Sequence, residues 1–244
     1  MELKVLDHGY VRYMDHMGSD ASILQAARVS YKSKGKGEEA DRKLLRYLFR
    51  RRHTSPFEMG KLQLNVKMPI FVMRQWVRHR MQNLNEVSAR YTELPSEFHI
   101  PTAWRQQDTK NKQGSVDVGE FNPAITLNFG GVCFTRSASH QVEALCDTAY
   151  DLYETLIAAG VAREQVRMVL PLNIYTEIVT CFDVHNLVNL LVKRRDKHAQ
   201  QEIRVFADAV LEIAKVYFPW TMEEYIRCEK SMLRVWGDDE VRTE

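Results

Sequence analysis

The clearest pattern in the chain is a strict alternation of apolar and polar residues at positions 62–68. The apolar residues are Leu62, Leu64, Val66 and Met68, and the polar ones are Gln63, Asn65 and Lys67. Because successive side chains of a strand point to opposite faces, this pattern predicts a half-buried β-strand. Pro69 follows directly and suits the first position of a helix, so a helix is expected from about Ile70 through Gln82.

Weaker patterns predict the remaining elements. They are a strand pair over 3–14, helices over 21–30 and 38–52, a long amphipathic helix through Val142, Leu145, Ala149, Leu152 and Leu156 closed by Gly160, a strand over 174–182, and a final helix over 184–218 ended by Pro219. Strands and helices do not alternate regularly, which favours an α+β fold over a doubly wound sheet. We expect a central, mostly antiparallel sheet flanked by long helices.

Residues 105–120 contain almost no apolar side chain and predict a mobile surface loop. A domain boundary there is disfavoured, because neither flank carries a complete core. We therefore expect one domain over 1–244 with a polar insertion at about 105–120.

Composition narrows the class of protein. Residues 68–73 form the longest apolar run, too short to span a membrane, and the first residues lack a secretory pattern, so a cytoplasmic protein is expected. The four cysteines, Cys133, Cys146, Cys181 and Cys228, form no cluster, and the eight histidines show no metal-ligand spacing, so we expect no metal site. A loose glycine pattern over 35–40 lacks the preceding strand that a dinucleotide-binding loop requires.

The net charge of +2 argues against a general nucleic-acid binder, but arginines are concentrated locally. The clusters lie at 50–52, 78–80 and 193–195. Each alone is consistent with a solvated helix face, and for 50–52 this interpretation is as good as a phosphate-steering role. Converging clusters would instead form an anion site.

Residues 74–91 carry the strongest chemical signal. Arginine forks at Arg78 and Arg80 suit a phosphate, and the short polar run over 85–90, with backbone amides available to a ligand, suits a base or sugar edge. An ordinary amphipathic helix with an exposed Arg78-His79-Arg80 is the alternative, and residue chemistry alone favours neither.

Arg78-His79-Arg80, followed after seven residues by Ser88, resembles the RHRx7S motif of flavin-dependent thymidylate synthases. Further segments resemble that family in order and spacing: residues 53–58, residues 167–173, and Arg194 with His198-Ala199-Gln200. The resemblance covers roughly residues 30–220.

The resemblance implies a homotetramer whose active sites are assembled from several subunits. It also implies reductive methylation of dUMP to dTMP, with FAD as cofactor, 5,10-methylenetetrahydrofolate as carbon donor and NADPH as reductant. No cysteine lies beside any motif, which agrees with a flavin route that needs no thiol nucleophile.

The resemblance also assigns site residues. FAD-contacting positions are Ser55, Arg78, His79, Arg80, Glu86, Asp183, His185 and Asn189, with Ser30 and His53 as further flavin-side positions. The dUMP pocket is matched by Gln75, Trp76, Val77, Arg78, Glu86, Val87, Ser88, Ala89, Arg90 and Arg194, with Arg167 as a further contact offered from a neighbouring subunit. The ring of Trp76 is expected in the core, and Ser88 is expected to hydrogen-bond the nucleotide rather than attack it.

Arg194 matches the catalytic arginine, which favours the ionised N3 of the uracil ring. A guanidinium stays charged at any working pH and stabilises a developing anion. Lys193 and Arg195 are expected to be solvated flanks. Asp183 and His185 stand where the family often has asparagine and arginine, which puts the flavin contacts there in doubt.

Two rival functions remain open at this stage. A basic nucleic-acid-binding module would use the three arginine clusters, but it gives no reason for Asn85-Glu86 inside the basic segment. A flavoprotein methyltransferase acting on uracil within RNA would share the cofactors but lack a mononucleotide pocket.

Overall fold

The computed structural model describes residues 1–244 except 31, 33–34, 36, 113 and 237–244. In the described part of the chain, a five-stranded sheet has the order β1-β2-β3-β9-β4. Its strands are β1 (Glu2–Val5), β2 (Gly9–Met17), β3 (Lys61–Pro69), β4 (Asn83–Glu86) and β9 (Tyr175–Asp183). All neighbouring pairs are antiparallel, which confirms the α+β class and the mostly antiparallel sheet.

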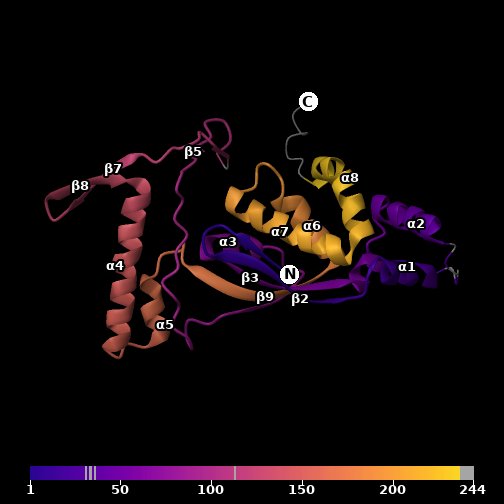
Figure 1. The fold of residues 1–244 in the computed structure, drawn as a ribbon, viewed down its shortest axis with the longest axis horizontal. Helices are drawn as coiled ribbons and strands as arrows, with labels where there is room; N and C mark the ends of the chain where they lie inside the picture. The colour runs from indigo at the N-terminus through magenta and orange to yellow at the C-terminus, as the bar shows by residue number, and fades with distance from the viewer. Residues whose placement is uncertain (31, 33–34, 36, 113, 237–244) are drawn as a thin grey trace.

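Helices border this sheet on one face and at both ends. They are α1 (Asp20–Val29), α2 (Glu38–Arg50), α3 (Ile70–Trp76), α4 (Ala138–Ala158), α5 (Arg163–Val166), α6 (Val184–Arg194), α7 (Gln201–Tyr217) and α8 (Pro219–Trp236), with short 3₁₀ turns η1 (Ser55–Met59) and η2 (Arg167–Val169). Figure 1 shows α6 and α7 against the sheet, α1 and α2 at one end, and α4 and α5 standing apart at the other. None of the helices in the described ranges is long and apolar enough to cross a membrane.

The predicted alternation in β3 is confirmed. Leu62, Leu64, Val66 and Met68 are all fully buried. They pack in one core with the apolar faces of α6 and α7, which include Leu190, Phe206 and Val210. Because each Å² of buried apolar surface contributes about 25 cal/mol, this layer stabilises the packing of α6 and α7 on the sheet.

The polar insertion at 105–120 lies largely at the surface and contains a short strand pair. Strands β5 (Gln106–Gln107) and β6 (Ser115–Val116) pair with each other. Strands β7 (Ala124–Phe129) and β8 (Val132–Ser137) form a second hairpin that leads into α4. The predicted amphipathic helix over 142–156 is confirmed, but Leu145 and Leu152 lie exposed on α4.

The expected helix from Ile70 to Gln82 was wrong beyond Trp76. The Gln82 amide donates to the carbonyl of His79 at 2.7 Å and to that of Trp76 at 3.4 Å, so it occupies acceptors that a continuing helix would use. The chain then enters β4, and the Val87 N–H donates to the Glu177 carbonyl at 2.9 Å. The expectation of available backbone amides at 85–90 therefore fails for Val87.

The expected single helix over 184–218 was also wrong, because the chain turns between α6 and α7. The Asp196 carboxylate accepts the His198 N–H at 2.7 Å, a local turn that competes with helix. Arg195 is not a solvated flank either. Its guanidinium bonds Asp208 at 2.6 Å and also pairs with Glu229, which ties the turn to α7 and α8.

Pro219 ends α7 but begins α8, a helix that the sequence patterns did not predict. Asp20 on α1 accepts the N–H groups of Trp220 at 2.7 Å and Thr221 at 3.2 Å, and it also accepts the Thr221 hydroxyl at 2.6 Å. This buried carboxylate therefore caps the start of α8 from a segment 200 residues away in the chain.

We expect Asp20→Ala to lower the free energy of unfolding by about 2–3 kcal/mol, because it leaves buried N–H groups of α8 without an acceptor. Urea denaturation followed by circular dichroism measures the change. Asp151→Ala, at an exposed position on α4, is the matched control and should change stability by less than about 0.5 kcal/mol. Equal stability of the two variants would contradict the capping role.

Candidate active site

Arg194, at the end of α6, lies against the loop that follows α3. Its Nε donates to Nε2 of His79 at 2.9 Å, and its Nη2 donates to the backbone oxygen of Gln75 at 2.8 Å. Its Nη1 lies 3.5 Å from the side-chain oxygen of Gln75. The structure thus brings together three residues that the resemblance assigned to the reaction.

Electrostatics at this cluster favour an anionic ligand. Burial, together with the Arg194 and Lys193 charges, lowers the pKa of His79 to about 4, so its imidazole is neutral near pH 7 and can accept the Arg194 proton donor. Burial and the nearby Arg78 charge lower the pKa of Arg194. Its guanidinium remains charged, because even a lowered arginine pKa stays far above neutrality.

The loop at 78–82 is anchored by Gln82, which the sequence patterns did not single out as functional. Its side-chain oxygen accepts the Trp76 indole N–H at 3.1 Å and the Thr180 hydroxyl at 2.6 Å. Trp76 is fully buried and meets Phe182 edge-on, which confirms its expected place in the core. Trp76 therefore packs in the core and holds the loop through Gln82. Its ring is not available to contact a ligand.

Arg78 and Arg80 project from this anchored loop. Both are exposed, and within the described residues neither makes a hydrogen bond or ion pair. The neighbouring Val77 is also exposed, at the end of α3. Two guanidinium groups without protein partners suit a phosphate-bearing ligand.

The residues assigned to the dUMP pocket continue along the edge strand β4. Glu86 accepts the Thr176 hydroxyl at 2.6 Å, and Ala89 is buried in a small second core. Arg90 pairs with the Glu164 side chain at 3.3 Å. Arg167 donates to the Glu164 backbone oxygen at 3.3 Å, so both arginines meet at α5. Val87 and Ser88 lie between, at the partly exposed surface.

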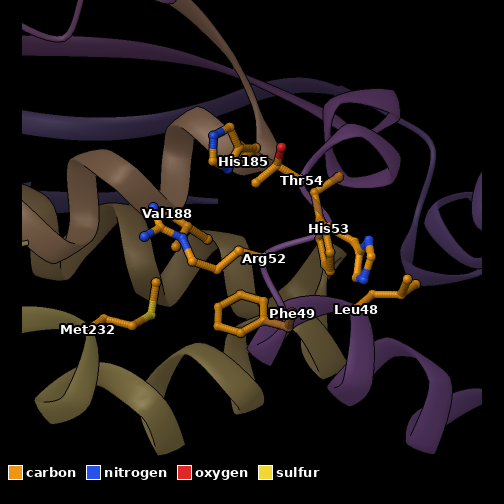
Figure 2. Close-up of a pocket in the computed structure, with 9 residues that line it drawn as sticks. Leu48, Phe49, Arg52, His53, Thr54, His185, Val188 and Met232 are labelled. Carbon is orange, nitrogen blue, oxygen red and sulfur yellow. The ribbon is translucent and has the colours of Figure 1, made fainter. Parts of the chain in front are cut away.

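A separate pocket holds other residues assigned to FAD. Figure 2 shows its lining side chains, among them Phe49, Arg52, His53, His185 and Met232. Asn189 lies next to the pocket, because its amide nitrogen is 3.3 Å from Nε2 of the lining residue His185. The lining includes neither Arg194 nor His79. The assigned residues therefore fall into two groups within one chain.

The remaining assigned positions border this pocket less closely. Ser55 begins η1, next to the pocket residue Thr54, and Ser30 caps the exposed end of α1. Asp183 caps α6, because its carboxylate accepts both the N–H and the side-chain amide of Asn186 at 2.8 Å. The carboxylate is thereby engaged inside the chain, so the doubt about Asp183 as a flavin contact has a structural basis.

Fit to a flavin dinucleotide can be judged from these side chains. The pocket offers apolar and aromatic surface from Leu48, Phe49 and Phe57 for a ring system. Arg78 and Arg80 offer charge for a pyrophosphate. The residues present therefore fit the group. Within the described residues, no cluster of histidine, cysteine, aspartate or glutamate could hold a metal ion.

Known proteins point to one family. A family model described as "Thymidylate synthase complementing protein" matches residues 12–220. A protein named "Flavin-dependent thymidylate synthase" from Wolbachia pipientis wMel is 44% identical over 227 residues, which are 92% of this chain and 76% of the relative. One of the same name from Thermus thermophilus is 45% identical over 219 residues, covering 90% of this chain and 76% of the relative.

Among solved structures, a UMP/dUMP methylase, PolB from Streptomyces cacaoi bound with 5-Br dUMP, aligns with a TM-score of 0.77. It is 26% identical, and the alignment covers 92% of this chain and 97% of that one. The chain belongs to the family of flavin-dependent thymidylate synthases, which are enzymes.

The neutral state of His79 predicts a pH dependence of stability. Its pKa is about 4 in the folded chain against an ordinary 6.5, so protons bind the unfolded chain more strongly between these values. Stability from this residue is therefore fully present above pH 6.5 and is lost as the pH falls toward 4. We expect His79→Gln to flatten the dependence of unfolding free energy on pH in this window.

Urea denaturation at several values of pH between 7.5 and 4 measures this dependence. His140→Gln, at an exposed position on α4, controls for the loss of one imidazole. An unchanged pH dependence in His79→Gln would show that this imidazole is not the group that titrates.

Proposed function

We propose that this enzyme converts dUMP to dTMP by reductive methylation, with FAD as cofactor, 5,10-methylenetetrahydrofolate as carbon donor and NADPH as reductant. The observation that carries the proposal is the half-buried Arg194 guanidinium, held by Gln75 and His79 next to the Arg78-His79-Arg80 loop. A charged group with fixed acceptors stabilises an anion without reorganising during the reaction.

The chain's residues would bind and orient dUMP in distinct ways. Arg90 would supply charge for the phosphate from the same chain, and Arg167 would supply further charge from a neighbouring subunit. Within one chain, both guanidinium groups are bonded to Glu164. Glu86 at the end of β4, with Ser88 and Ala89 just after it, would contact the sugar and base. Arg194 stabilises negative charge at N3 of the uracil ring, which makes the ring more electron-rich. Ser88 hydrogen-bonds the nucleotide and is not the nucleophile.

FAD would be held by the Arg78-His79-Arg80 loop, Glu86, Ser55 and the pocket around His53, His185 and Asn189, with Ser30 at its border. Bound in reduced form, the flavin supplies the hydride chemistry. Asp183 acts indirectly, because capping α6 holds His185 and Asn189 in place.

The thiols of the chain support a route without a cysteine nucleophile. Burial raises the pKa of Cys146, Cys181 and Cys228, which disfavours the reactive thiolate. Cys133 lies exposed on β8, in the hairpin that leads to α4. None of the four contacts the Arg194 cluster through a hydrogen bond in the described part of the chain.

Two observations support a homotetramer with shared sites. The pocket at His53 and His185 has a volume of only about 40 Å³, and ligand pockets typically hold about 300–1,000 Å³, so one chain encloses too little of a dinucleotide. Large apolar side chains also lie exposed on α4 and the β7–β8 hairpin, namely Ile125, Val132, Phe134, Leu145 and Leu152. Such a surface is typical of a subunit interface.

UMP is the second candidate substrate, because the PolB neighbour is a UMP/dUMP methylase. A polynucleotide is disfavoured, since the Glu86 carboxylate lies exposed within the segment that would have to meet its phosphates.

The central prediction is product formation. The purified protein, supplied with FAD, methylenetetrahydrofolate and NADPH, should convert dUMP to dTMP, as measured by product chromatography. Product should disappear when FAD is stripped and return when FAD is restored. Parallel reactions with UMP and with uracil-containing RNA test the alternatives. Methylation of either one in preference to dUMP would contradict the proposal.

Arg194→Ala should reduce turnover by about 10²–10³-fold, the usual loss when one donor to a developing anion is removed. Bound FAD, measured by its absorbance, should remain. Arg74→Ala is the matched control, because Arg74 is exposed on α3 one residue before Gln75 and its side chain makes no hydrogen bond within the described residues. Near-normal turnover in Arg194→Ala would remove Arg194 from the catalytic role.

A further inference from the structure

An ion pair fastens the polar insertion to the start of α7. Arg105 Nη2 donates to both carboxylate oxygens of Glu202, at 2.6 Å and 2.8 Å. Arg105 also donates to Ser115 at 3.0 Å and to Gln201 at 3.1 Å. The Glu202 side chain is only 8% exposed. Burying a carboxylate without its charged partner costs free energy, so this ion pair favours keeping the first turn of α7 against Arg105.

Gln200 immediately precedes α7 and reaches from it to the active site. Its side-chain oxygen accepts a hydrogen bond from the Gln75 side-chain amide. An amide has one donor end and one acceptor end. Because the donor end of Gln75 is engaged by Gln200, its oxygen end is left facing Nη1 of Arg194, 3.5 Å away. The backbone oxygen of Gln75 holds Nη2 of the same guanidinium.

These contacts form one path from the insertion to the catalytic arginine. We propose that Gln200, together with the Arg105–Glu202 ion pair, is a positioning element that orients Gln75 and thereby holds the Arg194 guanidinium against His79. The part that concerns turnover rests on the proposed function, whereas the placement of Arg194 beside His79 does not.

The surroundings of Gln200 make this role testable without unfolding the chain. A polar cavity of about 470 Å³ lies between the insertion and the α6–α7 turn, and its lining includes Arg105, Lys197, His198 and Gln200. Gln200 is half-buried beside this cavity and lies outside the apolar core, so a change of its side chain leaves that core intact. Gln200→Leu removes the acceptor and nearly preserves the side-chain volume.

His79 reports the position of Arg194 independently of turnover. The Arg194 charge is the second cause, after burial, of the low His79 pKa. If Gln200→Leu releases Arg194, the His79 pKa should rise by about one unit. Nuclear magnetic resonance of histidine-labelled protein, with its bound flavin, measures this titration. Gln106→Leu is the matched control, since Gln106 lies exposed on β5 and its side chain makes no hydrogen bond in the described part of the chain.

Turnover should change in a pattern that general loosening would not produce. In Gln200→Leu, kcat/KM for dUMP should fall about tenfold, while the KM for NADPH and the flavin content stay at wild-type values. Glu202→Gln keeps the side-chain size and removes the charge of the ion pair. It should shift both readouts in the same direction and by less. It also serves as the second variant if Gln200→Leu does not fold.

The two proposals can fail separately. If the wild-type protein forms no dTMP, the proposed function fails, and the His79 titration still decides the positioning role. If His79 titrates in Gln200→Leu and Glu202→Gln as it does in Gln106→Leu, the positioning role is overturned, whatever the activity.

Discussion

The site depends on a carbonyl group that the end of α3 leaves available. In a continuing helix, the Gln75 oxygen would accept the His79 N–H. Here the His79 N–H bonds the Trp76 oxygen instead, at 3.0 Å, and the Gln75 oxygen accepts Nη2 of Arg194. A half-buried guanidinium needs fixed acceptors, so the break after Trp76 is what allows Arg194 to sit there. Gln82 then keeps the broken helix from extending.

The sheet supplies the rigidity behind this arrangement. Antiparallel pairing of β9 with both β3 and β4 places Thr176 and Thr180 opposite Met68 and Leu64 on one side, and opposite the β4 region on the other. Thr180 bonds Gln82 and Thr176 bonds Glu86, so two hydroxyls of one strand anchor both ends of the Gln82–Glu86 segment that follows the arginine loop. The loop that carries Arg78 and Arg80, whose side chains make no hydrogen bond or ion pair with the described residues, is thus fastened to β9.

The sequence patterns predicted helices and strands correctly where the spacing of apolar residues determines the element. They missed the end of an element where a single side-chain hydrogen bond determines it. The alternation of β3 and the strand pair over 3–14 were confirmed, because the burial of one face of a strand shows directly in the order of apolar and polar residues. The ends of α3 and α6 were missed, because they depend on the side chains of Gln82 and Asp196 bonding nearby backbone groups. The motif residues Arg78, His79 and Arg194 were found by resemblance, whereas Gln82 and Glu202 act through contacts far apart in sequence. Thr176 and Thr180, two polar residues on the same face of β9, were the signal in the sequence that was not used.

Helix α6 explains why the assigned residues form two groups. His185 and Arg194 are nine residues apart, which is about 13.5 Å along the axis and about half a turn around it. His185 therefore faces the pocket with His53, while Arg194 faces Gln75 and His79 on another side of the same helix. A ligand bound at one group would have to pass around the helix to reach the other. In the homotetramer proposed above, each group would be completed by another copy of the chain, so that α6 would contribute one face to each of two sites.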